Sequence, residues 1–216
     1  MVIVFATLSD KKFAISQFPF LNQKQIQIEP NWIDTDNFFP KNHAIEKVDL
    51  GYIGRFTKQK NLNLLIDAAK KIDASIHLYG GGEEQKNLDR ACTGSKCKIF
   101  PWQKNENVPG LLNSFRIFVL PSHFEGNPKV LLEAMSCGCA VIATNVPGNR
   151  EIIKHGVNGI LCKPDVKHMT NAISYLLDNQ NVRKELGKNA REYIENNYSL
   201  TRFLKREEKR LRMFKS

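Results

Sequence analysis

Short apolar runs alternate with amphipathic segments along the chain from about residue 47 onward. Six such pairs follow one another: VDLGYIG with NLNLLIDAAKKI, SIHLYG with EEQKNLDRAC, CKIF with NVPGLLNSF, RIFVLPS with PKVLLEAMSC, AVIAT with GNREIIKH, and GILCK with DVKHMTNAISYLLDN. Apolar runs of this length without polar alternation are typical of strands that are buried on both faces. The pattern therefore predicts an α/β fold, a doubly wound parallel six-stranded sheet of Rossmann-like type with helices on both faces.

The two ends of the chain depart from this alternation. Two further helices are predicted over residues 181–197 and 199–214, the second with an apolar stripe that needs a surface to cover. Near the start, a strand around Val2 to Phe5 and a short helix with Ser9 as its N-cap precede a proline-bracketed connector. We expect a strand-plus-helix unit over 1–28, a connector over 29–44, the main domain over 45–197, and a basic amphipathic helix over 198–216. The stripe comprises Leu200, Phe203, Leu204, Leu211 and Phe214.

The net charge of +10 is concentrated near the carboxyl end of the chain. Seven Lys or Arg residues stand against two Glu between Arg202 and Lys215. Such a local excess favours contact with an anionic membrane surface or an acidic partner over a nucleic-acid groove, and a solvated helix is the simpler alternative. Since the chain has no apolar run of about 18 residues and opens without a basic leader, we expect a cytoplasmic protein, with peripheral contact at the inner face of a membrane as a refinement.

The five cysteines do not predict a metal or redox site. They fall mostly in or beside apolar runs, where a reduced thiol behaves as a small hydrophobic group. The closest pair, Cys137-Gly-Cys139, lacks the spacing of a zinc site, and the five histidines are scattered. We therefore expect reduced thiols and no metal.

Polar residues follow several of the predicted strands, at the edge of the sheet where ligands of such folds bind. Arg55 and Lys60 follow the first strand and are spaced so that two cations can flank an anion. The second strand ends in three glycines, which are followed by Glu83 and Glu84. Because these acids would repel a phosphate at the next helix start, the glycines are interpreted as permitting close approach of backbone to a ligand.

The segment after the fourth strand, PSHFEGNPKVLLEAM, offers a better phosphate site. Pro128 suits the first position of a helix, and the amides of Lys129, Val130 and Leu131 would then point outward from the helix start. No acidic residue lies in that first turn, so the helix dipole would favour an anion there.

Two glutamates bracket this helix start. Glu133 lies about one and a half turns inside the helix among apolar residues, where a carboxylate needs donors such as the two hydroxyls of a ribose. Glu125 precedes the helix and can reach hydroxyls of a group attached to the phosphate. A salt bridge for Glu133 and a turn-stabilising role for Glu125 are the structural alternatives.

These residues carry a resemblance to a known family. EGNPKVLLEAM has the E-x7-E pattern of the retaining GT-B fold glycosyltransferases known as group 1 or family 4. The resemblance extends through PNWIDTDNFFP, GYIGRFTKQKNLNLLIDAAKK and LYGGGEE, and covers nearly all of residues 29–197. Five ordered motifs are far more specific than one E-x7-E alone.

The resemblance implies a nucleotide-sugar donor site. By similarity, Arg55 and Lys60 hold the diphosphate, together with the amides of Lys129, Val130 and Leu131. Glu133 binds the ribose, and Glu125, Gly126 and Asn127 bind the donor sugar. The implied catalytic residues are Glu125, Arg55 and Lys60. Phe100 and Pro101 would lie against the base, where the family more often has a glycine. Members of the family need no metal or other cofactor, since cationic groups and a helix dipole neutralise the departing diphosphate.

The resemblance also implies a missing half, because the GT-B fold has a second Rossmann-like domain that binds the acceptor. We expect residues 1–28 to be the last strand and helix of that acceptor domain, and the chain to require a separate or absent acceptor domain for sugar transfer. The implied partners are a nucleotide-sugar donor, a saccharide or lipid-linked saccharide acceptor of polysaccharide biosynthesis, and an acceptor-domain chain or a second copy of this chain. A non-catalytic nucleotide-sugar binding module or truncated gene product is the alternative, and an NAD enzyme is disfavoured by the incomplete glycine fingerprint.

Overall fold

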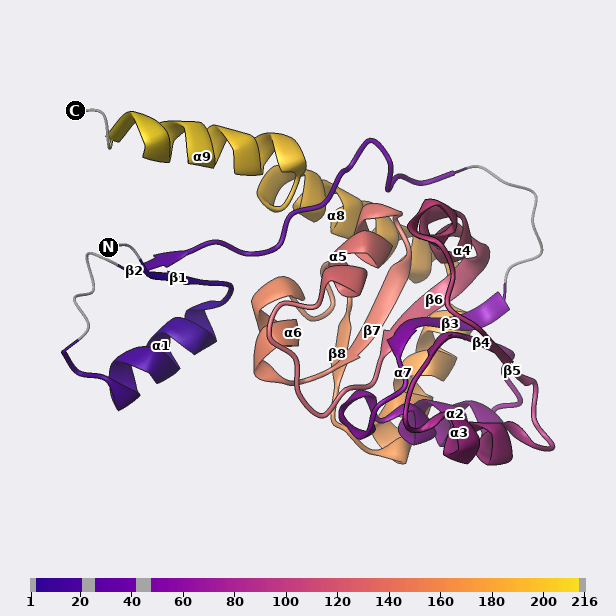
Figure 1. Cartoon of the computed structure of the whole chain (residues 1–216). Helices are drawn as coiled ribbons and strands as arrows, with labels where there is room; N and C mark the ends of the chain where they lie inside the picture. The colour runs from indigo at the N-terminus through magenta and orange to yellow at the C-terminus, as the bar shows by residue number, and fades with distance from the viewer. Residues whose placement is uncertain (1–2, 21–25, 42–47, 214–216) are drawn as a thin grey trace.

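The main body is one parallel sheet with helices on both faces (Figure 1). The computed structural model describes residues 3–20, 26–41 and 48–213 of the 216-residue chain. Within them, six strands lie in the order β5-β4-β3-β6-β7-β8, and all neighbouring pairs are parallel. The predicted doubly wound six-stranded sheet is confirmed. The strands are β3 Val48–Arg55, β4 Ile76–Gly81, β5 Cys97–Phe100, β6 Phe115–Leu120, β7 Ala140–Thr144 and β8 Ile160–Cys162.

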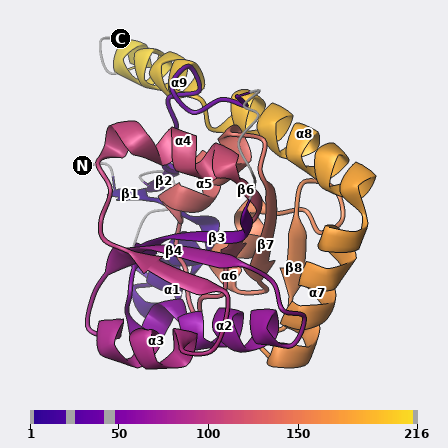
Figure 2. The same cartoon turned by 90° about the vertical axis from the view of Figure 1, so that its right-hand side faces the viewer.

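The helices form two layers, one on each face of the sheet (Figure 2). One layer contains α2, α3 and α7, which contact one another, and the other contains α4, α5 and α8. The short helix α6 follows β7 and contacts the amino-terminal helix α1. Their bounds are α2 Leu62–Lys70, α3 Gln85–Cys92, α4 Val108–Ser114, α5 Lys129–Ser136, α6 Pro147–Ile152, α7 Val166–Asp178 and α8 Gln180–Asn197, with two 3-10 turns at Lys58–Lys60 and Asn105–Asn107.

The strand order reverses direction between β3 and β6. From β3 the chain builds outward through β4 to β5, and α4 then carries it back to β6 on the other side of β3. In open α/β sheets, ligands bind outside the carboxyl ends of the two strands at such a switch point. The loops after β3 and after β6 therefore flank the expected ligand crevice. The predicted Arg55 is the last residue of β3, and the two loops hold Lys60 and Glu125.

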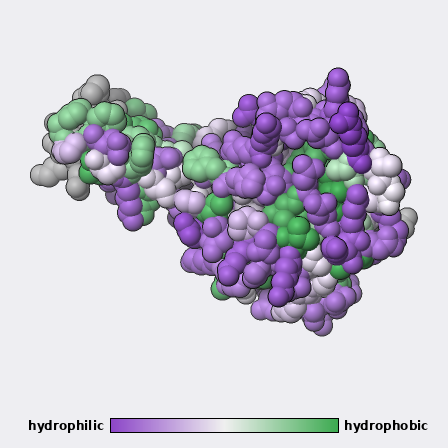
Figure 3. Space-filling model, turned by 90° about the horizontal axis from the view of Figure 1, so that it is seen from below, coloured by the Kyte–Doolittle hydropathy of each residue, from purple (hydrophilic) through white to green (hydrophobic). Residues whose placement is uncertain are grey.

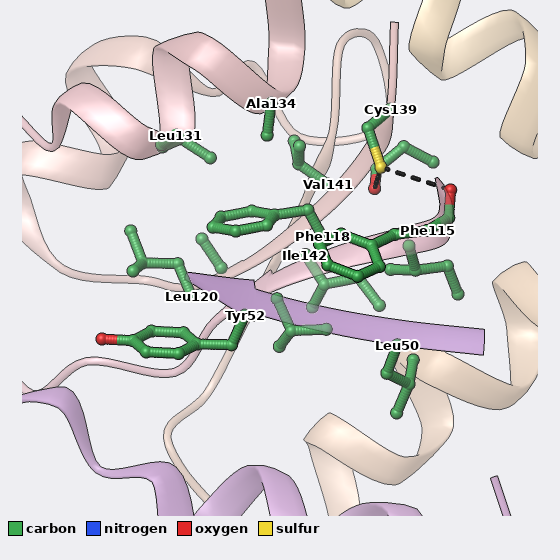
Figure 4. Close-up of a cluster of buried hydrophobic side chains, with 14 of the residues drawn as sticks. Leu50, Tyr52, Phe115, Phe118, Leu120, Leu131, Ala134, Cys139, Val141 and Ile142 are labelled. Atoms are coloured by element: carbon green, nitrogen blue, oxygen red, sulfur yellow. Dashed lines mark hydrogen bonds between the residues drawn. The ribbon is translucent and has the colours of Figure 1, made fainter. Parts of the chain in front are cut away.

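The core is built from the apolar runs of the central strands and the inner faces of the helices (Figure 4). Phe118 of β6 and Leu131 of α5 are fully buried, and so is Tyr52 of β3, whose hydroxyl lies at the end of the cluster in the close-up. At roughly 25 cal/mol per Å² of apolar surface removed from water, each such side chain contributes about 1.5–3 kcal/mol. This core fixes the ends of β3 and β6 on which the site is built.

Residues 3–20 and 26–28 form a small module beside the main sheet (Figure 1). Strands β1 Ile3–Phe5 and β2 Ile26–Ile28 pair in parallel as a two-stranded sheet, and helix α1 Leu8–Gln17 connects them in sequence. As predicted, the first strand is not an inner strand of the large sheet; Val2 lies outside the described residues.

The predicted N-cap of α1 is wrong. Thr7 caps the helix, since its side chain accepts a hydrogen bond from the amide of Asp10. Ser9 instead lies in the first turn and donates its amide and its hydroxyl to the carboxylate of Glu151 in α6, at 2.9 and 2.6 Å. Leu8 donates its amide to the same carboxylate. A tertiary contact from α6 therefore occupies the amides of the first turn.

The carboxyl-terminal helix α9 Leu200–Met213 projects from the main body (Figure 1). Leu204 and Leu211 are 55% and 62% exposed, whereas Leu200 and Phe203 are half-buried, so the predicted poor coverage of the stripe is confirmed for the two outer leucines. Phe214 lies outside the described residues. No helix in the described ranges is both long enough and apolar enough to cross a bilayer.

The expectation of five reduced thiols is wrong for one pair. Cys92 at the end of α3 and Cys97 at the start of β5 are joined as a disulfide. The turn between them brings the two residues together, with a Cα–Cα distance of 5.1 Å. By contrast, Cys137 is buried, and this burial raises the pKa of its thiol to about 12, so the thiol stays protonated.

Candidate donor-binding site

The loop after β3 and the loop after β6 are joined by three contacts at the switch point. The amide of His123 donates to the carbonyl of Gln59 at 2.8 Å, and the side-chain amide of Gln59 donates to the carbonyl of Phe124 at 2.7 Å. Next to them, the Lys60 Nζ lies 2.6 Å from the Glu125 Oε1. The structure thus brings together Lys60 and Glu125, which are 65 residues apart in the sequence.

Glu125 is a buried carboxylate with only one oxygen engaged. It is 5% exposed, and its Oε1 accepts hydrogen bonds from both Lys60 and the hydroxyl of Ser122, each at 2.6 Å. The Ser122 carbonyl accepts a further bond from Thr144, which fixes this turn to the end of β7. In the described part of the chain, the Oε2 of Glu125 has no hydrogen-bond partner and can accept one from a ligand hydroxyl.

Arg55 is held at the end of β3 through its main chain. The buried hydroxyl of Tyr52 donates to the Arg55 carbonyl at 3.0 Å, while the Arg55 side chain is exposed. Burial raises the pKa of Tyr52, and the negative charge of Glu125 raises it further. The tyrosine therefore stays protonated and donates this hydrogen bond. The bond fixes the backbone of Arg55 at the end of β3, and the guanidinium extends from this fixed position.

Helix α5 starts one residue later than predicted. Pro128 is the N-cap, with an extended backbone, and no side chain of the described residues caps the helix. The Leu131 amide donates to the Pro128 carbonyl at 3.1 Å, and Leu131 is fully buried. The prediction that the Leu131 amide points outward is therefore wrong, because this amide donates the first hydrogen bond of the helix. The amides of Lys129 and Val130 have no hydrogen-bond partner among the described residues and remain available to an anion.

Glu133 is a half-buried carboxylate in the second turn of α5. Burial raises its pKa, and Lys129, one helical turn earlier, partly opposes that shift. Within the described ranges the carboxylate has no hydrogen-bond or ion-pair partner, so the alternative of an internal salt bridge for Glu133 is not what the structure contains. A desolvated acid without donors is an unfavourable arrangement that a ligand bearing hydroxyls would relieve.

The triple glycine at the end of β4 takes part in packing within the protein. A Cβ atom on Gly80 would lie 1.9 Å from the carbonyl oxygen of Gly54, and one on Gly82 would lie 2.4 Å from that of Phe56. Both positions also have positive φ angles, 149° and 155°. Gly80 and Gly82 therefore let the ends of β3 and β4 approach each other, and the interpretation that the glycines admit a ligand stays a prediction.

The segment predicted to face the base is split between two environments. The Phe100 ring stacks on Tyr79, with centroids 4.6 Å apart, and thus packs on the sheet. Pro101 is exposed, and the next residue, Trp102, is 57% exposed with its indole beside Gly81 at the carboxyl end of β4. Trp102 was missed from the sequence, although an exposed tryptophan directly after a strand end is a recognisable signal.

Two cavities lie at opposite edges of the sheet. One of about 210 Å³ is at the carboxyl edge and includes Thr57, Glu84 and His123 in its lining. The other, of about 730 Å³, is at the amino edge, beside the start of β6 and β7. Glu125 and Glu133 line neither of these two cavities, and the contacts above define the candidate site.

Comparisons with known proteins agree with this geometry. The family model described as glycosyl transferases group 1 matches residues 34–193. An uncharacterized glycosyltransferase of Methanocaldococcus jannaschii, MJ1178, is 30% identical over 194 residues, which are 87% of this chain and 55% of that protein. An Escherichia coli UDP-Gal:alpha-D-GlcNAc-diphosphoundecaprenol alpha-1,3-galactosyltransferase is 28% identical, with 89% of this chain and 55% of that enzyme covered. The chain thus spans about half the length of these curated relatives.

Solved structures share the fold. HepE from Anabaena, solved in complex with UDP, superposes with a TM-score of 0.88 at 20% identity, covering 98% of this chain and 64% of that one. At this identity the likeness concerns the fold, which is that of GT-B glycosyltransferases. Since the family model covers residues 34–193, which are most of the chain, the chain belongs to the glycosyl transferases group 1 family.

Proposed function

We propose that this chain binds a nucleoside diphosphate sugar and acts as the donor half of a glycosyltransferase that transfers a hexosyl group with retention of configuration. The observation that carries the proposal is the arrangement around α5. Two unpaired amides at its start and an unpartnered carboxylate at Glu133 lie on the helix that follows β6 at the switch point. An anion and a vicinal diol are the two ligands that these groups lack.

The diphosphate is assigned to the space between the loop after β3 and the start of α5. Arg55 contributes an exposed guanidinium, and Lys60 has two further N–H donors besides the one that Glu125 accepts. With the amides of Lys129 and Val130, these groups would neutralise the departing diphosphate without a metal ion. Binding that persists after treatment with EDTA would support this part of the proposal.

The two glutamates assign the positions of the ribose and of the sugar at the two ends of the nucleotide-sugar donor. The ribose is assigned to Glu133, and the sugar to the unengaged oxygen of Glu125 with the backbone of Gly126 and Asn127. The base is assigned to Pro101 and Trp102, which stand exposed after β5. UDP is the first nucleotide to test, because the E. coli relative is named for UDP-galactose and the Anabaena structure contains UDP.

The acceptor groups are proposed to come from a second α/β unit that docks on the amino-terminal module. That module, the lobe on the left of Figure 3, is largely apolar on the face seen there. Phe13, Phe18 and Phe20 are 67%, 51% and 81% exposed. Parallel strands are ordinarily buried on both faces, and a two-stranded sheet is marginal alone, so β1 and β2 call for further strands. A second copy of this chain is the alternative partner.

A membrane-bound acceptor fits the charge of α9. Arg206 and Arg210 are occupied by Glu29, at 2.9 and 2.7 Å, whereas Lys205 and Lys209 remain exposed on the helix. The E. coli relative is named for a lipid-linked acceptor. We therefore propose a saccharide or lipid-linked saccharide as acceptor, with α9 making peripheral contact with anionic lipid.

The function is tested by calorimetry followed by reconstitution. The full chain is titrated with UDP, GDP, ADP and their glucose and galactose conjugates, with Glu185→Gln on the exposed surface of α8 as the control variant. Sugar transfer is then assayed after the chain is mixed with an acceptor-type α/β half from a relative. Failure to bind any of these nucleotides contradicts the proposal. Binding without transfer under any pairing would leave a non-catalytic nucleotide-sugar binding module as the function.

A further inference from the structure

Helix α5 starts without the side-chain cap that helices ordinarily have. The N-cap is Pro128, which has no side-chain donor or acceptor, and it follows a Gly-Asn pair that is conformationally permissive. The amides of the first turn are therefore left for a ligand, but nothing within the helix itself fixes the turn that presents them. Some other segment has to hold residues 126–128 in place.

The connector between the amino-terminal module and the main sheet contacts this turn on both sides of Pro128. Asn31 makes two hydrogen bonds with Asn127: its backbone amide donates to the Asn127 Oδ1 at 3.0 Å, and its side-chain amide donates to the Asn127 carbonyl at 2.6 Å. The next connector residue, Trp32, lies under the Lys129 Nζ, which is 5.8 Å from the ring centroid. Asn31 and Trp32 thus contact Asn127 and Lys129, the two residues that flank the N-cap.

The connector is itself anchored to the main body. Ile33 is 1% exposed, its amide donates to the Tyr198 carbonyl at 2.8 Å, and its carbonyl accepts from the Leu200 amide at 2.9 Å. Trp32 stacks on Phe203 of α9, with centroids 5.7 Å apart. Figure 1 shows the connector passing the junction of α8 and α9 on its way from β2. Asn31 is therefore presented from a fixed support and is not a mobile loop residue that happens to touch the turn.

We infer that Asn31 is a positioning residue for the donor loop: it braces the turn before α5 and holds Asn127 so that the loop presents its sugar-binding groups. The bond from the Asn31 amide occupies the Oδ1 of Asn127 and thereby turns the Asn127 Nδ2 away from the connector. In the described part of the chain that Nδ2 has no partner, so it can donate to a hydroxyl of the sugar. The inference about the sugar rests on the proposed function, whereas the bracing of the turn does not.

The bracing is tested on the ligand-free full chain by amide hydrogen exchange measured with NMR. The amides of Leu131 and Leu132 are reporters, because both donate to the Pro128 carbonyl and open when the turn opens. In Asn31→Ala their exchange is expected to be faster by about threefold to tenfold, the factor that one uncharged hydrogen bond gives. Asn31→Asp, which keeps the shape but cannot donate to a carbonyl, should do the same. Asn37→Ala, at an exposed connector position, should change nothing.

Binding provides the second measurement. For Asn31→Ala the Kd for UDP-glucose is expected to rise by about threefold to tenfold, while the Kd for UDP changes by less than about twofold, and the melting temperature stays that of the parent. Unchanged exchange at Leu131 and Leu132 in both Asn31 variants overturns the positioning role, whatever the binding results. If the parent chain binds no nucleotide sugar but the exchange effect is present, the proposed function fails and the brace remains.

Discussion

Replacing Glu133 by glutamine should affect stability and nucleotide binding in opposite directions. The parent carboxylate is desolvated in α5 and has no donor among the described residues, so its charge destabilises the ligand-free chain. Glutamine keeps the size and removes the charge. Replacing a destabilising functional residue commonly raises the free energy of unfolding by about 0.5–2 kcal/mol. For a chain of this size, each kcal/mol raises the melting temperature by about 2–4 °C. We expect Glu133→Gln to be the more stable protein at pH 7.5.

The pH dependence follows from the direction of the pKa shift. Burial raises the pKa of Glu133 in the folded chain above the value of 4.5 that an unperturbed carboxyl has. The folded state therefore binds the proton more tightly than the unfolded state, and stability falls as the pH rises from 4.5 through the folded pKa. Below pH 4.5 the side chain is neutral in both states and the advantage of glutamine should vanish. Thermal denaturation at pH 4 and pH 7.5 checks this difference.

Binding should change in the opposite sense. Charged hydrogen bonds to the ribose hydroxyls are worth about 1–3 kcal/mol, so Glu133→Gln should weaken the binding of the preferred ribonucleotide by about 5- to 150-fold in calorimetry. The matching 2′-deoxynucleotide should bind parent and variant more nearly alike, since it lacks one of the two hydroxyls. A Glu133→Gln protein that is less stable at pH 7.5, or that binds the ribonucleotide as the parent does, would refute the assignment of this acid to a diol.

Three further experiments test the remaining parts of the site and surface. Lys60→Met leaves the buried Glu125 without its cation and should destabilise the chain by about 2–3 kcal/mol in chemical denaturation, and adding Glu125→Gln should restore most of the loss; independent, additive effects would contradict the pairing. Trp102→Ala should weaken nucleotide binding by about 1–3 kcal/mol with an unchanged melting temperature, because the ring is exposed, and an unchanged Kd would remove it from the base site. Leu204→Ser with Leu211→Ser should reduce self-association in sedimentation or binding to anionic vesicles; if neither property changes, the exposed stripe is not a docking surface.

The fold could be predicted because its signals are local. A strand buried on both faces must be apolar throughout, so β6 and β7 stand out as FRIFVL and AVIAT without reference to any other segment. Helix spacing then fixes the connections, and the parallel order follows. The positions of Glu125 and Glu133 on either side of one helix start could be predicted in the same way, while their roles stay predictions.

The features that could not be predicted depend on contacts between distant segments. The Leu131 amide looked available, but the backbone of Pro128 turns so that its carbonyl accepts it. The close packing of Gly80 and Gly82 could not be predicted, because their neighbours, the carbonyls of Gly54 and Phe56, lie in another strand and loop. Asn31 carried no signal at all, since its partner Asn127 is 96 residues away. Tertiary proximity of this kind leaves no periodicity in the sequence.

Under the proposed function, the pairing of Lys60 with Glu125 would let one ion pair serve both the sugar and the diphosphate of the donor. A buried carboxylate needs a cation and hydrogen-bond donors to stay charged, and Lys60 with Ser122 supplies both at a single oxygen. The second oxygen would thereby remain a charged acceptor for a hydroxyl, and the same ammonium has two further donors for the proposed diphosphate. Because Glu125 already neutralises Lys60 in the ligand-free chain, the positive charge that attracts the diphosphate would come from Arg55 and from the dipole of α5. Loss of the diphosphate would then return Lys60 to Glu125 alone, so the same contact that prepares the sugar-binding acid also compensates the lysine after the leaving group has gone.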